Sequence, residues 1–123
     1  MDMSGILSLS THCSPIRISL SGKDIMTLAA TIKNASGEPR IVSVDLVLPS
    51  ELGVDDVGVN TNKNIRLGEI PPGESREASF GIYATHRTNP AEYEAHLTAF
   101  AHYRNYDSVL EKVSLKTTIR VVE

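Results

Sequence analysis

Several residue types are scarce or missing in this chain of 123 residues. Tryptophan is absent and aromatic residues make up 5% of the sequence, which excludes the buried tryptophan typical of antibody domains. The one cysteine, Cys13, cannot form an intramolecular disulfide. The chain must therefore fold without an internal disulfide, and its length and its 41% of hydrophobic residues suffice for one domain with a core.

An excess of basic charge and long hydrophobic runs are also missing. The net charge is −3 and the pI is about 5.8, so no nucleic-acid partner is expected, because such binding needs a strongly basic surface. No segment approaches the ~20 apolar residues of a membrane span, and the N-terminus has no signal-peptide pattern. We expect a soluble chain that is cytoplasmic if full-length, and exported or at the cell surface if excised from a longer protein.

Motifs of catalysis and metal binding do not occur. We find no G-x-S-x-G elbow, P-loop, H-E-x-x-H or paired CxxC, so no catalytic residues and no cofactor are predicted. His96 and His102 share one face of a predicted strand, but six strand residues separate them by roughly 20 Å, too far for one zinc ion. We therefore predict no metal site.

The longest irregular segment, residues 49–64, is rich in Asn, Asp and Gly. Loops of this length are often functional. Its oxygen-bearing side chains do not match the spacing of a calcium-binding loop, so a solvated loop is favoured while ion binding stays open. The side chains concerned are Asp55, Asp56, Asn60, Asn62 and Asn64.

Apolar and polar residues alternate along most of the chain, which is the pattern of half-buried strands. Turn signals separate seven predicted strands, and no helical period appears. We predict an all-β fold, an immunoglobulin-like antiparallel β-sandwich over residues 16–123, with residues 1–15 as an arm or an extra edge strand. The predicted strands are approximately 16–20, 25–34, 41–48, 65–67, 75–83, 92–103 and 110–122.

Three segments carry a resemblance to a known group of domains. Residues 67–75 (LGEIPPGES) form a proline turn between two strands and resemble the L-G-x-L-x-P-G-E-S turn of bacterial and archaeal Ig-like accessory domains, of the CARDB (cell-adhesion-related) and NEW3 types. Residues 31–37 (TIKNASG) resemble the V-x-N-x-G end of their second strand. Residues 90–95 (PAEYEA) resemble their P-G-x-Y-x-V motif, with Ala91 in place of glycine. The resemblance implies adhesion, domain spacing or presentation of a binding face, without catalytic residues.

Two polar residues in these motifs allow alternative interpretations. Tyr93 opens the sixth predicted strand, where a structural tyrosine corner, with the hydroxyl bonded to the backbone of the preceding turn, is favoured over a ligand role. Asn34 begins an N-glycosylation sequon, Asn-Ala-Ser, which matters only if the chain is exported in a glycosylating organism.

Strand parity predicts which side chains face outwards. The third, sixth and last predicted strands share a sheet in this architecture, and their outward side chains mix apolar groups with a basic stripe. Aromatic residues often anchor interfaces, so Phe100 is the expected centre of a candidate interaction face, with an ordinary solvated face as the alternative. The residues of this face are Ile41, Val47, His96, Phe100, His102, Lys112, Lys116 and Arg120.

The predicted function is that of a non-catalytic protein-interaction or spacer module. The partner is a different protein with an acidic surface or a second copy of the chain, since basic side chains line the face. A carbohydrate-binding accessory domain is an alternative, although only four Tyr and two Phe are available for a sugar platform. A small enzyme with its site in residues 49–64 is a third possibility.

Overall fold

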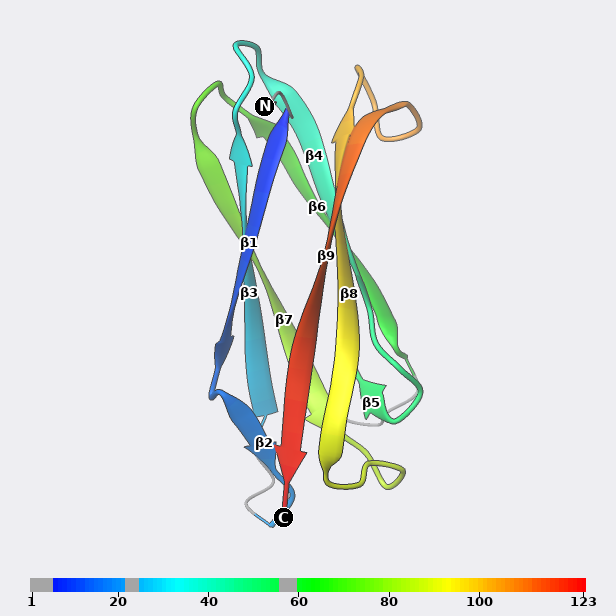
Figure 1. The fold of residues 1–123 in the computed structure, drawn as a ribbon. Helices are drawn as coiled ribbons and strands as arrows, with labels where there is room; N and C mark the ends of the chain where they lie inside the picture. Colours follow the sequence, from blue (N-terminus) through cyan, green and yellow to red (C-terminus); the bar gives the residue numbers. More distant parts are fainter. Residues whose placement is uncertain (1–5, 22–24, 56–59) are drawn as a thin grey trace.

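A computed structural model describes residues 6–21, 25–55 and 60–123, which form nine β-strands and no helix (Figure 1). None of the described segments is a helix that could cross a membrane. The four-stranded sheet has the order β1-β3-β7-β5, with bounds Leu7–Ser14, Ile25–Asn34, Ser75–Ala84 and Leu52–Gly53. The five-stranded sheet has the order β2-β9-β8-β4-β6, with bounds Arg17–Ser19, Val109–Val122, Ala91–His102, Arg40–Val47 and Asn62–Ile70. The predicted all-β sandwich is confirmed, but it has nine strands rather than seven.

The two strands beyond the seven predicted are β1, in the segment expected to be an arm or an extra edge strand, and β5, which was not predicted. β1 pairs antiparallel with β3 at the edge of its sheet, and the Glu111 carboxylate anchors its start by accepting bonds from the N–H groups of Ile6 and Leu7 at 2.7 and 3.1 Å. β5 has two residues, which pair with the end of β7. Two residues are too few to show a sequence period.

The chain passes from one sheet to the other between β1 and β2. A cis Ser14–Pro15 bond lies at this crossover, where proline has no N–H to continue the ladder of β1. β2 then pairs with β9 in parallel, which departs from the wholly antiparallel arrangement predicted. Ile16 is 82% exposed although the alternation placed it inward, because it precedes the first residue of β2.

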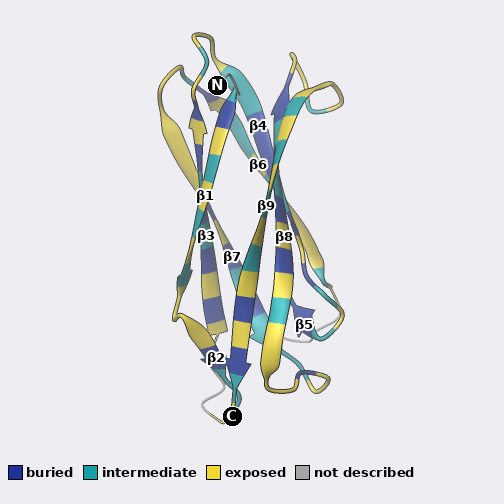
Figure 2. Cartoon of the chain, viewed as in Figure 1, coloured by how far each residue is buried: buried dark blue, intermediate teal, exposed yellow. Residues whose placement is uncertain are grey.

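Alternate side chains of the central strands fill the space between the sheets, as the bands of burial along each strand show (Figure 2). Phe80 of β7 is the largest fully buried side chain, and each buried aliphatic or aromatic side chain contributes about 1.5–3 kcal/mol. The inward positions predicted for four strands are confirmed. They are Met26, Leu28, Ala30 and Ile32; Val42, Val44, Leu46 and Leu48; Ala78, Phe80 and Ile82; and Ala95, Leu97, Ala99 and Ala101.

Tyr103 is the exception in the sixth predicted strand. Period-2 alternation along the predicted strand 92–103 puts it on the inward face with Ala101, but its side chain is 48% exposed. The pairing of β8 with β9 shifts register between Ala101 and His102, and a bulge of this kind changes the direction of the residues that follow. The β8–β9 hairpin loop, residues 103–108, begins at this shift.

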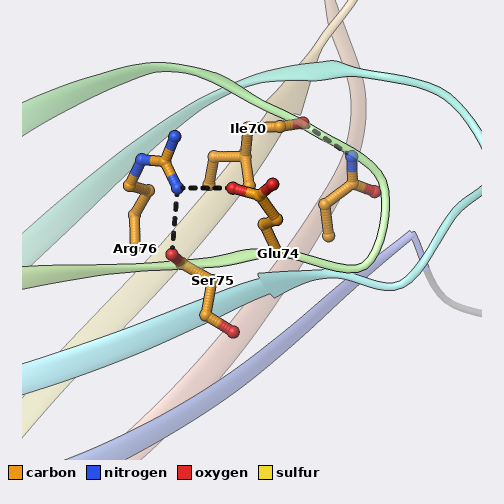
Figure 3. Close-up of polar contacts among 5 residues, drawn as sticks. Ile70, Glu74, Ser75 and Arg76 are labelled. Atoms are coloured by element: carbon orange, nitrogen blue, oxygen red, sulfur yellow. Dashed lines mark hydrogen bonds and ion pairs between the residues drawn. The ribbon is translucent and has the colours of Figure 1, made fainter.

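The buried side chain of Asn34 joins the two sheets at the end of the sandwich where the proline turn lies. Its Nδ2 donates to the carbonyl oxygens of Glu38 and Ile70 at 2.7 and 2.8 Å. Figure 3 shows Ile70, the second acceptor, beside the proline turn. Its Oδ1 accepts from the backbone N–H and the hydroxyl of Ser36 at 3.0 and 2.7 Å. All hydrogen-bonding capacity of this amide is used, and a fully buried Asn34 is not available for a glycan in the folded chain.

The backbone of the proline turn is bonded to the same residue. Asn34 N–H donates to Glu74 O at 2.9 Å, and Gly73 N–H donates to Asn34 O at 2.8 Å. Gly73 has φ +78°, a left-handed conformation that glycine adopts without steric cost. A turn between two strands within residues 67–75 is therefore confirmed, but it covers only residues 71–74, because β6 continues to Ile70 and β7 begins at Ser75. These backbone bonds join the turn to the end of β3, the neighbour of β7 in the same sheet.

We predict that Asn34→Ala lowers the free energy of unfolding by about 2–4 kcal/mol, because the substitution removes four side-chain hydrogen bonds, among them the buried bond to the Ile70 carbonyl oxygen. Urea unfolding followed by circular dichroism measures the loss. Asn62→Ala, on the exposed edge of β6, is the control and should change stability by less than about 0.5 kcal/mol. Equal losses in the two variants would contradict the structural role of Asn34.

Candidate functional site

The predicted interaction residues lie on neighbouring strands of the five-stranded sheet. β4, β8 and β9 are adjacent, so the prediction that the third, sixth and last predicted strands share a sheet is confirmed. Val47, His96 and Lys116 form one row across the three strands. Phe100 lies between Ser43 and Lys112 in a second row, and His102 lies opposite Ile41 in a third.

The predicted residues differ in exposure. Val47 is 43% exposed, the side chains of His96, Lys112 and Lys116 are exposed, and Ile41 and Phe100 are half-buried. Arg120, at the far end of the face, forms an ion pair with Glu92 at 2.8 Å, so its charge is partly compensated. The basic stripe therefore consists mainly of Lys112 and Lys116.

His102 was predicted to be exposed, and this prediction is wrong. Its side chain faces the outer side of the sheet but is only 5% exposed, because the β8–β9 hairpin loop covers it. The ring of Tyr106 packs edge-on against the imidazole with centroids 5.1 Å apart, and the ring of Phe100 lies 6.1 Å away. Tyr106, which lies in a loop outside the alternating strands, thus buries a side chain that faces outwards.

Tyr106 lines a pocket of about 320 Å³ on this face of the sheet. Residues from β4, β6, β8 and the hairpin surround it, combining two aromatic rings with a guanidinium, an amide, a hydroxyl and an imidazole. Only Asn64 comes from the segment 49–64 in which an enzyme site had been considered. The lining residues are Ser43, Asn64, Arg66, Phe100, His102, Tyr106 and Val109.

A bulge in β6 holds Tyr106 in place. Val42 pairs with Gly68 but Ser43 pairs with Arg66, so one extra residue is inserted at Leu67. Gly68 has φ +76°, the left-handed conformation typical of a bulge glycine. Its N–H donates to the Tyr106 hydroxyl at 3.0 Å, and the Arg66 guanidinium lies 4.5 Å from the centre of the Tyr106 ring.

Ser43 and His102 form a buried hydrogen-bonded pair inside this pocket. Ser43 Oγ lies 2.8 Å from His102 Nε2. Hydrolytic enzymes use such a pair only when a third group orients the other ring nitrogen of histidine. Within the described residues, His102 Nδ1 is buried and has no hydrogen-bond partner, so this third member is missing from the pair.

In the part of the chain that the structure describes, the side chains considered for ion binding in residues 49–64 do not form one cluster. Asn60 donates to Asp55 at 2.8 Å and Asn64 donates to Asp45, while Asp56 lies outside the described residues. In the described ranges no group of three or more His, Cys, Asp or Glu side chains is placed to hold a metal ion.

Cys13 is a half-buried residue of the edge strand β1. Burial raises the pKa of its thiol, and a hydrogen bond with Thr117 opposes this effect only in part. A raised pKa disfavours the thiolate, which is the reactive form of cysteine.

Tyr93 has the structural role that was favoured for it. Its hydroxyl donates to Asn89 O at 2.8 Å and accepts from Asn89 N–H at 3.1 Å. The tyrosine corner is therefore confirmed, and it fixes the turn that leads into β8.

Comparison with known proteins shows the fold. No protein family and no curated protein matches the sequence. Among solved structures, a FixG-related protein from Vibrio parahaemolyticus is similar with a TM-score of 0.63 and 11% identity, over 96% of this chain and 98% of that chain.

Two further similar structures are much longer. Native alpha-2-macroglobulin from Escherichia coli, spanning domain MG7 to the C-terminus, matches with a TM-score of 0.64 and 16% identity, over 94% of this chain and 16% of that chain. Pseudomonas fluorescens alkylpurine DNA glycosylase AlkC, bound to DNA with an abasic site analog, matches with a TM-score of 0.56 and 14% identity, over 94% and 30%. The likeness establishes an immunoglobulin-like β-sandwich.

We predict that Tyr106→Ala raises the rate at which diethylpyrocarbonate modifies His102 several-fold, because the substitution removes the ring that covers the imidazole. Mass spectrometry measures this rate relative to that of His96, which is exposed in the same strand. Tyr103→Ala, at the exposed tyrosine of the same loop, is the matched control and should leave the ratio unchanged. A His102 rate unaffected by Tyr106→Ala would show that the loop does not cover the pocket in solution.

Proposed function

We propose that this protein is a non-catalytic interaction module that binds an acidic protein partner through the outer face of its five-stranded sheet. The observation that carries this proposal is the group of exposed apolar side chains at the β8–β9 hairpin, where Tyr103, Val109 and Leu110 are each at least 45% exposed. Val47 is 43% exposed but lies in the row of His96, toward the other end of β4. Phe100 lies on the same sheet, and apolar and aromatic groups at the centre of a patch are typical of interfaces.

Charge favours a different protein over a second copy of the chain. Lys112 and Lys116 follow the exposed face of β9, and neither has an ion-pair partner among the described residues. In a two-fold dimer the same surface meets itself, so these lysines would approach basic side chains of the second copy. An acidic surface would complement them and raise the association rate.

The non-catalytic part of the proposal draws support from the Ser43–His102 pair, because none of the described residues bonds to Nδ1 and orients the imidazole. A sugar-binding role receives less support. Tyr103 is the one aromatic side chain that is strongly exposed in the described parts of the chain, and a single ring makes a poor platform for stacking a sugar.

In two of the similar structures this fold accounts for a minor part of a longer chain, as expected for an interaction or spacer module.

We predict that Phe100→Asp abolishes partner capture, because it puts a carboxylate into the apolar centre of the face and opposes an acidic surface. Affinity capture from native-host extract measures binding, and light scattering measures the mass. Thr27→Asp, on the exposed face of β3 in the other sheet, is the matched control and should bind as the wild type does.

Three results bear on this expectation. Capture that is lost in Phe100→Asp, kept in Thr27→Asp and weakened by salt supports an acidic partner. Identical capture and mass in all three proteins contradicts the proposed face. A wild-type dimer that Phe100→Asp converts to a monomer would replace the acidic partner with a second copy.

A further inference from the structure

We propose that the pocket beside His102 is a binding site for a carboxylate joined to a small apolar group. The apolar walls are Phe100, Tyr106 and Val109, and Ser43 and Arg66 supply polar groups at the same pocket. Its volume of about 320 Å³ is at the lower end of the range for ligand pockets. It therefore suits a single side chain or a small acid rather than an extended ligand.

The Ser43–His102 pair has one more donor than the protein uses. A serine hydroxyl and a neutral imidazole carry one proton each, and only one of these protons lies in the 2.8 Å bond between Oγ and Nε2. If serine donates, Nδ1–H is left without an acceptor; if histidine donates, the serine O–H is left over. In the first case the buried Nδ1–H has no acceptor among the described protein groups, and it is closed off from the pocket. In the second case the O–H of Ser43, which lines the pocket, can donate to a ligand, and a carboxylate accepts such a donor.

Arg66 adds a positive charge at the same place. Its guanidinium is stacked on the Tyr106 ring at 4.5 Å, and within the described ranges it has no carboxylate partner. Stacking fixes the plane of the guanidinium and leaves its edge free for the two parallel hydrogen bonds that arginine makes to a carboxylate. The unused donor and the guanidinium thus both favour a carboxylate as the ligand.

The negative charge of Asp45 repels an anion and so determines where in the pocket a carboxylate would bind. It follows Ser43 by two residues on the same face of β4, and its carboxylate accepts a hydrogen bond from Asn64. The ligand carboxylate should therefore lie at the Arg66 and Tyr106 end of the pocket, away from Asn64. Removing the negative charge of Asp45 should strengthen binding, and removing the charge of Arg66 should weaken it.

The carboxylate can belong to a free acid or to a partner protein. The pocket opens on the proposed interaction face, so an acidic residue or a chain terminus of the partner could enter it. The pocket chemistry does not depend on a protein covering the rest of the face, and small ligands can test it separately.

The test uses three ligands of nearly equal shape, benzoate, benzamide and benzamidine, whose charges are −1, 0 and +1. Each is titrated into the ¹⁵N-labelled protein, and amide shifts are followed by NMR. Benzoate should give saturable shifts at Ser43, Phe100 and His102. Its affinity should be at least about tenfold higher than that of the neutral and cationic analogues, since charge-assisted hydrogen bonds are about twice as strong as neutral ones. Arg66→Gln should weaken benzoate roughly tenfold and Asp45→Asn should strengthen it several-fold, whereas Arg120→Gln should have no effect.

Several outcomes would overturn the carboxylate site. One is equal affinity for benzoate and benzamide. Another is the absence of a saturable shift up to about 50 mM benzoate, which would mean an affinity weaker than millimolar. The third is that Arg66→Gln and Arg120→Gln change benzoate affinity equally. Tighter binding to Asp45→Asn cannot result from a folding defect, so the test holds even if Arg66→Gln is unstable.

Partner capture with Arg66→Gln then identifies the source of the carboxylate. Loss of the partner assigns it to the partner protein, and retained capture assigns it to a free acid. Absence of benzoate binding together with loss of capture in Phe100→Asp would overturn the pocket inference and leave the proposed function standing.

Discussion

The side-chain amide of Asn34 is the contact on which the closed end of the sandwich depends. It is fully buried and makes four hydrogen bonds, and a buried amide with even one bond missing would cost stability instead of adding to it. Because Asn34 ends β3 and Ile70 ends β6, this amide connects strands of different sheets. The hydrophobic core holds the sheets together over their length, whereas Asn34 sets how they meet at this end.

The same connection leads from the fold to the candidate site. Ile70 is held by Asn34, and Gly68, two residues earlier, forms the bulge whose N–H binds Tyr106. Tyr106 in turn covers Ser43 and His102. Gly68 of the LGEIPPGES segment therefore helps to position a residue that lines the pocket on the outer sheet face, although the segment itself leads into a turn.

Period-2 alternation was sufficient to predict the core, because an inward position in a central strand is set by local sequence. It could not predict β5, which is too short for a period, or β6 over its full length, because an edge strand with polar residues at Asn62 and Asn64 has no apolar alternation.

Parity placed Phe100 and His102 on the outer face. The burial of His102 and the approach of Arg66 depend on a bulge and on a loop that folds back over the sheet, and both are tertiary features that local patterns do not contain. The resemblance to CARDB-type domains stays a prediction, since the similar structures share only the fold.

The most direct test of the central role of Asn34 is hydrogen exchange of its side-chain amide protons, followed by NMR in D₂O. Both protons are bonded to backbone carbonyl groups and the Asn34 side chain is fully buried, so they should exchange only when the whole domain unfolds. Their rates should match those of the most protected backbone amides of β3 and β7 and should fall far below those of the exposed Asn62 side chain. Exchange as fast as that of Asn62 would show that the amide opens independently of the sandwich and would contradict this account.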